Sequence, residues 1–200
     1  MISICFKDIK GRTWEHVFGE FQSIMRKFVL KYKYLLDSEL LDDDEKEYIA
    51  RCVSDNYEID REDIGNIIDR LIDLLYKHHG SKNKVVILID EYDTPIQQAY
   101  LDGFYKEVVS LMFPIFSKLK DNPNVEKCVF TGITRVSRES LFSGVNQIQC
   151  HSVMSTGYSF YFGFTENEVE SICAKEHLKD LKSWYNGYKS NIGTTEEPIF

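Results

Sequence analysis

The chain has 200 residues, 43% of them hydrophobic and 28% charged, a composition that excludes a disordered chain and suits a globular domain. Its formal net charge of -8 disfavours binding to nucleic-acid phosphates or anionic lipid unless a local basic patch exists. The five cysteines include no Cys-x-x-Cys pair, and no apolar run reaches about 18 residues. We therefore expect a reduced, cytoplasmic protein without a zinc ribbon or a membrane span.

A strand and a long helix are predicted at the amino end. Ser3–Phe6 is a short apolar run, and Gly11–Thr13 interrupts it and caps a helix. In Trp14–Leu36 apolar residues recur at i, i+3 and i+4, which is typical of an amphipathic helix. The acidic segment Asp37–Glu47 follows, and we interpret it as a solvated loop and helix start rather than a metal site, because blocks of like charge stay hydrated.

A further helix precedes the most informative strand. Asp60 and Asp63 favour a helix start, apolar residues at helical spacing fill Ile64–Leu75, and Gly80 suits the left-handed position after the helix end. Val85–Ile89 is apolar without interruption. Such a run predicts a central parallel strand covered by helices on both faces.

One more helix and one more strand follow. Thr94 is expected to be the N-cap of the helix, with Pro95 at its first position. Pro114 is expected to kink or divide the helical pattern that continues beyond it. Lys127–Thr131 then predicts a second buried strand, which ends at Gly132.

The order of these elements predicts an α/β fold. Strand, helices, strand, helix and strand together indicate a three-layer domain with a parallel sheet flanked by helices. We assign residues 1–163 to this core and residues 164–200 to a helical C-terminal extension of the same domain. The extension begins at the capping box of Thr165 and Glu168.

The heptapeptide Val85–Glu91 is the strongest chemical signal. Its apolar residues bury a strand and bring Asp90 and Glu91 to the carboxyl end, the edge at which open α/β sheets bind ligands. In a P-loop ATPase, an Asp at this place holds Mg²⁺ through water, and the adjacent Glu polarises the attacking water. The alternative is that both carboxylates merely end the strand.

A second strand end supplies further candidate groups. Thr131 lies where such enzymes place a residue that touches the γ-phosphate or the attacking water. Arg135 follows and offers a guanidinium to phosphate oxygens, although a surface salt bridge explains it equally well.

The phosphate-binding loop of a P-loop enzyme is absent from these 200 residues. That loop has the form Gly-x-x-x-x-Gly-Lys-Ser/Thr, and its backbone amides and its lysine hold the phosphates. Gly80–Lys82 lacks the upstream glycine, and it precedes a strand rather than following one. Since the loop follows the first strand of this fold, we expect the missing strand and loop to lie upstream of Met1.

Four segments in order resemble a known family. They are Asp90–Ile96, Phe130–Arg135, Tyr161–Thr165 and Trp184–Tyr188. Together they are similar to the AAA-ATPase-like domain family, bacterial P-loop NTPases often fused to a C-terminal nuclease-like domain of the PD-(D/E)XK type. Ser3–Asp8 resembles the strand that follows the P-loop region of that family.

The resemblance implies roles for particular residues. Asp90 and Glu91 match the Walker B acids, and Thr131 to Arg135 match the sensor-like segment. Mg²⁺ and ATP are the cofactors implied for the complete domain, whereas nucleic acid would be a partner only through the absent nuclease-like domain. Because the phosphate loop is missing, we expect this chain, a fragment or a copy without turnover, to bind and hydrolyse ATP very weakly or not at all.

Two alternatives remain. A P-loop-like scaffold without its loop is a non-catalytic interaction module, with the aromatic-rich Tyr158–Phe164 as its contact surface. A metal-dependent hydrolase using Asp90, Glu91 and Asp93 is less favoured, because successive side chains of an extended segment point in opposite directions and no His cluster completes a site.

Overall fold

In the computed structural model the chain divides into two compact units, Met1–Asn146 and Gln147–Phe200. The structure describes residues 1–54, 56–80, 82–134, 148–152, 158, 163–173, 177, 180–181, 184, 188–189 and 198–199. The domain boundary expected between residues 163 and 164 falls inside the second unit and stays a prediction.

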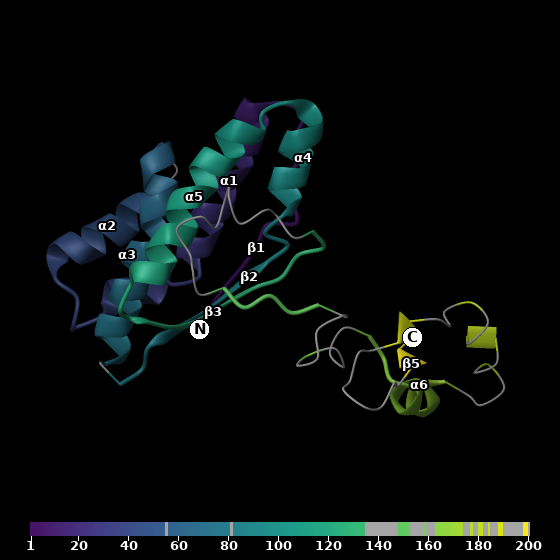
Figure 1. Cartoon of the computed structure of the whole chain (residues 1–200). Coiled ribbons are helices and arrows are strands. Elements are labelled where there is room, and N and C mark those ends of the chain that lie inside the picture. The colour runs from purple at the N-terminus through teal and green to yellow at the C-terminus, as the bar shows by residue number, and fades with distance from the viewer. Residues whose placement is uncertain are drawn as a thin grey trace. The chain divides into compact units, whose positions relative to one another are not determined.

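The first unit contains a three-stranded parallel sheet, which lies along one side of its helices (Figure 1). Its strands are β1 (Ile2–Cys5), β2 (Val85–Asp90) and β3 (Val125–Phe130), hydrogen-bonded in that order. Cys5 pairs with Asp90 in the register of β1 and β2, so both strands end at the same edge. The predicted α/β class with a parallel sheet is confirmed.

Helices connect these strands, as parallel pairing requires. They are α1 (Trp14–Leu30), the 3₁₀ helix η1 (Lys33–Asp37), α2 (Asp43–Val53), α3 (Arg61–His79), α4 (Thr94–Asp102) and α5 (Tyr105–Asp121). The predicted helix over residues 14–36 is therefore an α-helix followed by a separate 3₁₀ helix. Pro114 lies inside a continuous α5 and packs over Gly65 of α3, where a Cβ atom would approach the proline Cβ to 3.0 Å.

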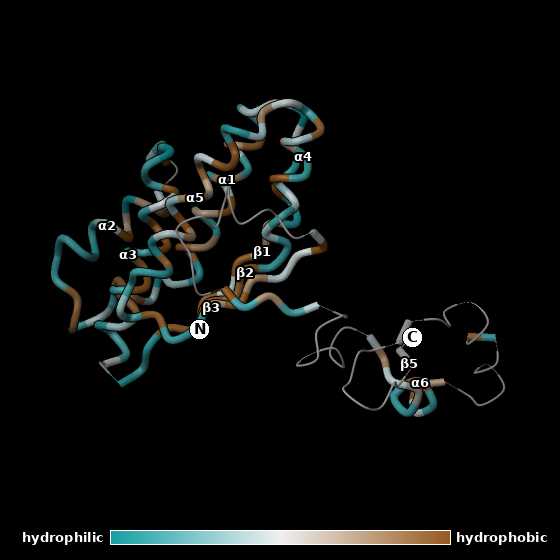
Figure 2. Tube along the Cα trace, in the orientation of Figure 1, coloured by the Kyte–Doolittle hydropathy of each residue, from teal (hydrophilic) through white to brown (hydrophobic). Residues whose placement is uncertain are grey.

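The hydrophobic core lies between the helices and one face of the sheet, and Figure 2 shows hydrophobic residues in all three strands. Ile87 and Ile89 of β2 are buried on this face. Phe116 of α5 meets Phe130 of β3 edge to face, with the ring centroids 5.1 Å apart. Burial of each such side chain contributes roughly 1.5–3 kcal/mol, which fixes the strand ends against the helices.

The other face of the sheet is less covered. Val86 and Leu88 of β2 are half-buried, and Val129 of β3 is 38% exposed. The expected central position of β2 is confirmed, and its apolar residues alternate between buried and half-buried. Within the described ranges helices cover one face, so the third layer and the missing first strand stay predictions.

In the second unit the structure describes helix α6 (Glu166–Ile172). The predicted capping box of Thr165 and Glu168 begins it. Two short antiparallel strands, β4 (Tyr188–Lys189) and β5 (Pro198–Ile199), were not predicted from sequence. Across all described residues, every helix is too short or too polar to cross a bilayer.

Candidate functional site

The carboxyl ends of β2 and β3 bring two predicted site residues into contact. The Thr131 hydroxyl donates a hydrogen bond to Asp90 Oδ1. Thr131 N–H donates to the carbonyl of Ile89 at 2.9 Å and so extends the ladder by one residue beyond β3. Both Asp90 and Thr131 are exposed, so the pair faces solvent at the edge where parallel sheets bind ligands.

Glu91 follows in a strained turn. Its φ of 51° is left-handed, a conformation that costs a residue with a side chain about 1–2 kcal/mol. Its N–H donates to Asp90 Oδ1 at 3.0 Å, and its Oε2 accepts a hydrogen bond from the Thr94 hydroxyl at 3.1 Å. Thr94 was expected to cap α4, but Asp93 occupies the N-cap position and the Thr94 hydroxyl orients the Glu91 carboxylate instead.

Cys5 is a site residue that was not predicted from sequence. Its thiol lies 3.8 Å from Asp90 Oδ2, on the carboxylate oxygen that Thr131 does not contact. The signal was present, because Cys5 lies at the end of the first predicted strand and parallel strands end at a common edge. The Asp90 carboxylate is therefore contacted from both neighbouring strands.

Asp93 is buried and connects the turn after β2 to the segment after β3. Its Oδ2 accepts hydrogen bonds from Gln97 Nε2, Thr134 N and Thr134 Oγ1, each at 2.6 Å. Tyr92 adds two more bonds, from its N–H to the Thr131 carbonyl at 3.1 Å and from its hydroxyl to the Thr134 carbonyl at 3.0 Å. Because Asp93 is only 1% exposed and already bonded, it is not available as a direct metal ligand.

The charge and the donor atoms of this edge suit a hard cation. In the described ranges, ion pairs join His16 to Glu20 and Lys77 to Asp42 and Glu45, and none reaches Asp90 or Glu91. Carboxylate oxygens with water are the ligands that Mg²⁺ prefers. Those ranges hold no cluster of three or more His, Cys, Asp or Glu residues able to bind a metal.

Comparison with known proteins places the chain in a family. The model of a family described as predicted AAA-ATPase matches residues 1–142. The chain belongs to this AAA-ATPase-like family. It is also 33% identical over 117 residues to an uncharacterized protein in the vnfD 5' region of Azotobacter chroococcum mcd 1, a match that covers 56% of this chain and 22% of that protein. No solved structure matches the chain.

The predicted site residues of this AAA-ATPase-like chain fall into two groups. Asp90, Glu91 and Thr131 lie together at one edge of the sheet, as the strand order predicts. Arg135 lies outside the described residues. The catalytic and metal-binding roles of all four stay predictions.

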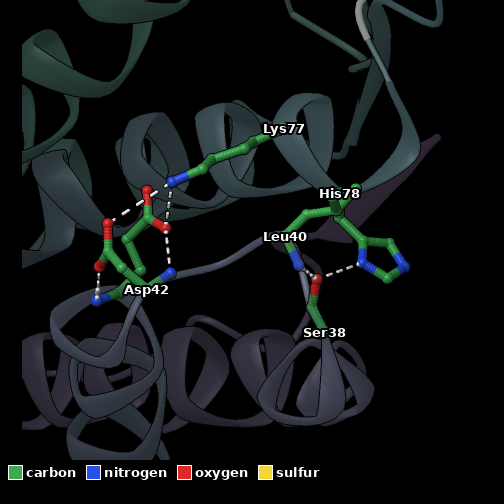
Figure 3. Close-up of polar contacts among 6 residues, drawn as sticks. Ser38, Leu40, Asp42, Lys77 and His78 are labelled. Atoms are coloured by element: carbon green, nitrogen blue, oxygen red, sulfur yellow. Dashed lines mark hydrogen bonds and ion pairs between the residues drawn. The ribbon is translucent and has the colours of Figure 1, made fainter.

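A second acidic region of the AAA-ATPase-like chain has a different structure. Asp42 caps α2 and forms a capping box with Glu45, which confirms the interpretation of residues 37–47 as loop and helix start. Lys77 Nζ lies 2.6 Å from Glu45 Oε2 and 3.5 Å from Asp42 Oδ2, and Figure 3 shows Lys77 reaching Asp42 from α3. The backbone N–H of Glu45 lowers the pKa of Asp42, and the hydrogen bond to Glu45 raises the pKa of Lys77.

Beside this region, Ser38 is buried between η1 and α3. Its hydroxyl oxygen lies 2.8 Å from His78 Nδ1 and accepts a hydrogen bond from Leu40 N–H at 3.2 Å (Figure 3). These contacts join the loop after η1 to the end of α3 and leave the Ser38 hydroxyl with a structural partner on each side.

Proposed function

We propose that the edge formed by β2 and β3 is the half of an ATPase site that handles magnesium and water. Asp90 would hold Mg²⁺ through water, Glu91 would polarise the attacking water, and Thr131 would contact that water or the γ-phosphate. The observation that carries this proposal is the hydrogen bond from Thr131 to Asp90, which unites groups from two adjacent strand ends. Membership of the AAA-ATPase-like family supports it.

The chemistry assigned to the chain's own residues follows from their contacts. The Glu91 carboxylate accepts a proton from water, and its hydrogen bond to Thr94 fixes the direction from which it does so. Thr131 presents an exposed hydroxyl beside Asp90. A bound Mg²⁺ would supply neutralisation of the charge that develops on the phosphate oxygens.

We further propose that this chain alone holds the phosphates of ATP weakly. Its 200 residues contain no Gly-x-x-x-x-Gly-Lys-Ser/Thr string, whose amides and lysine hold phosphates in P-loop enzymes. Arg135 is a second proposed cation for the phosphate oxygens. The chain alone is therefore expected to show no micromolar affinity for Mg-ATP in isothermal titration calorimetry, and a micromolar Kd would contradict this.

The decisive experiment measures ATP hydrolysis by the protein as its natural gene encodes it. Glu91→Gln is expected to lower kcat by about 10²- to 10⁴-fold, because the general base is lost while the shape is kept. Glu126→Gln, an exposed carboxylate on β3, is the matched control and should leave kcat unchanged. ATPase activity that survives Glu91→Gln would refute the assignment.

A second candidate function is a non-catalytic interaction module. Two aromatic side chains of the second unit favour it, since Tyr158 is 47% exposed and Phe164 is 56% exposed. This function predicts a stable oligomer of defined mass in analytical ultracentrifugation, and a mass that falls when both aromatics are changed to serine. No ATPase activity would be found in the natural protein in that case.

A further inference from the structure

We propose that Asp93 is a positioning residue of the site. Its buried carboxylate holds residues 131–134 in the place that brings Thr131 to Asp90. This inference rests on the ATPase function proposed above and assigns to Asp93 a role distinct from those of the neighbouring acids, Asp90 and Glu91.

The burial of Asp93 makes its partners important. An ionised carboxylate removed from water is costly unless hydrogen bonds replace its hydration. Asp93 has three such bonds on Oδ2, and two of them come from Thr134, 41 residues away in the sequence. Bonds to a charged acceptor are about twice as strong as neutral ones, so displacement of Thr134 would leave this charge poorly compensated.

Gly132 provides a second, steric observation. A Cβ atom at this position would lie 2.5 Å from Asp93 Oδ1 and 2.9 Å from Cε1 of the Tyr92 ring. Real Cβ atoms do not come so close, so the segment passes Asp93 only because residue 132 is glycine. The hydrogen bonds from Thr134 and the close approach of Gly132 to Asp93 therefore both fix the segment 131–134.

The position of Thr131 depends on this attachment. Thr131 is held on one side by the Ile89 carbonyl and on the other by Tyr92 N–H, while Asp93 fixes the chain three residues further on. Asp90 is exposed and contacts Thr131 directly, whereas Asp93 is buried and meets no solvent. Asp93 therefore acts through Thr131 rather than on a bound phosphate.

A simpler role as helix cap does not explain Asp93. It occupies the N-cap position of α4, where an aspartate usually accepts a bond from the N2 or N3 backbone N–H. Its side chain makes no such capping bond and turns instead to Thr134 and to the Gln97 side chain. The carboxylate thus joins α4 to the segment after β3 and does not cap the helix backbone.

The first test measures amide hydrogen exchange by NMR in the 200-residue chain. Asp93→Asn keeps the shape but removes the charge, and it should reduce protection of the Thr134 amide by at least about tenfold. Asp102→Asn is the matched control, because Asp102 is exposed on the same helix and also accepts a bond from a glutamine, Gln98. Unchanged exchange at Thr134 in a folded D93N chain would overturn the proposal.

The second test measures steady-state ATPase kinetics in the protein encoded by the natural gene. D93N and Gly132→Ala should each lower kcat between about 10-fold and 100-fold with KM for ATP unchanged, because Asp93 positions a reacting group and does not bind nucleotide. Should D93N fail to fold, Thr134→Val, which removes one of the three donors, serves the same test. Full kcat in these variants, in a protein that E91Q inactivates, overturns this inference alone. An E91Q protein with full activity overturns the proposed function and this inference with it.

Discussion

Two acidic regions of the first unit contrast in how their charges are compensated. At the start of α2, Asp42 and Glu45 share the ammonium group of Lys77. After β2, Asp90 and Glu91 accept hydrogen bonds from hydroxyl, thiol and backbone groups, and no ion pair in the described ranges neutralises them. The first region carries its own cation, whereas the carboxylates of the second are held by hydrogen bonds within the described part of the chain.

This contrast shows why acidic density alone does not mark a site. Residues 37–47 contain the longest acidic stretch of the sequence, yet their carboxylates serve a helix start and an ion pair. The shorter group after β2 is distinguished by its place at a sheet edge and, among the residues that the structure describes, by having no ion pair. An external cation is what such an edge can accept.

The largest expected effect compares one glutamate from each region. In the natural protein, Glu91→Gln should lower kcat for ATP by at least about 100-fold, because it removes the proposed base. Glu45→Gln changes the same chemical group in the other region and should leave kcat within about twofold. An equal loss of kcat in steady-state assays of the two variants would contradict a functional difference between the two regions.

The next largest effect is on the free energy of unfolding, and it comes from Asp93, the buried acid of the region after β2. Asp93→Asn should lower the free energy of unfolding by about 1.5–3 kcal/mol, the usual contribution of hydrogen bonds to a buried charged group. Asp42→Asn changes an exposed carboxylate and should cost less. Urea denaturation followed by circular dichroism compares the two, and a larger loss in D42N would contradict the assigned roles.

The next smaller effect is on the rate of cysteine labelling, which tests whether solvent reaches the acidic region after β2. Cys5 is exposed beside Asp90, whereas burial raises the pKa of Cys128 to about 11. At pH 8 iodoacetamide should therefore alkylate Cys5 at least about tenfold faster, since the thiolate is the reacting form. Mass spectrometry of tryptic peptides measures both rates, and faster labelling of Cys128 would show that this edge is covered.

The smallest expected effect is the loss of stability at acid pH that comes from Asp42, at the start of α2. The hydrogen bond from Glu45 N–H lowers the pKa of Asp42 below its ordinary value, so the stability that it contributes is present above that value. This stability is lost as the pH falls through the lowered pKa of the folded state. Thermal melts between pH 2 and pH 6 should show a weaker pH dependence of Tm in Asp42→Asn than in the unchanged chain. An equal pH dependence in the two proteins would contradict a contribution of Asp42 to stability.

The positions of β2 and β3 were predictable from short apolar runs, although the expectation that β3 is buried is wrong, because its residues are half-buried or exposed. Val85–Ile89 and Lys127–Thr131 located β2 and β3 to within about two residues, and parallel pairing then placed Asp90 beside Thr131. The sequence also marked the helix starts at Asp60 and Thr165, where a capping box requires two residues three apart.

The rest of the site depends on contacts between distant parts of the chain. The bond from Thr134 to Asp93 spans 41 residues and follows from the register of β2 and β3, which no local pattern specifies. Thr94 has the local sequence pattern of an N-cap, but in the structure its hydroxyl donates a hydrogen bond to Glu91 across the turn after β2. Pro114 leaves α5 undivided, and its ring packs against Gly65 of a helix that precedes it by about 50 residues.

The left-handed backbone at Glu91 has an evolutionary consequence. Glycine adopts such a conformation without strain, so replacement of Glu91 by glycine would stabilise this turn while removing its carboxylate. A lineage that keeps glutamate here accepts lower stability in exchange for a carboxylate at this edge. A lineage freed from that requirement gains by drifting to glycine. Glutamate at this position in a related protein would therefore indicate that selection maintains the carboxylate, and glycine would indicate that it does not.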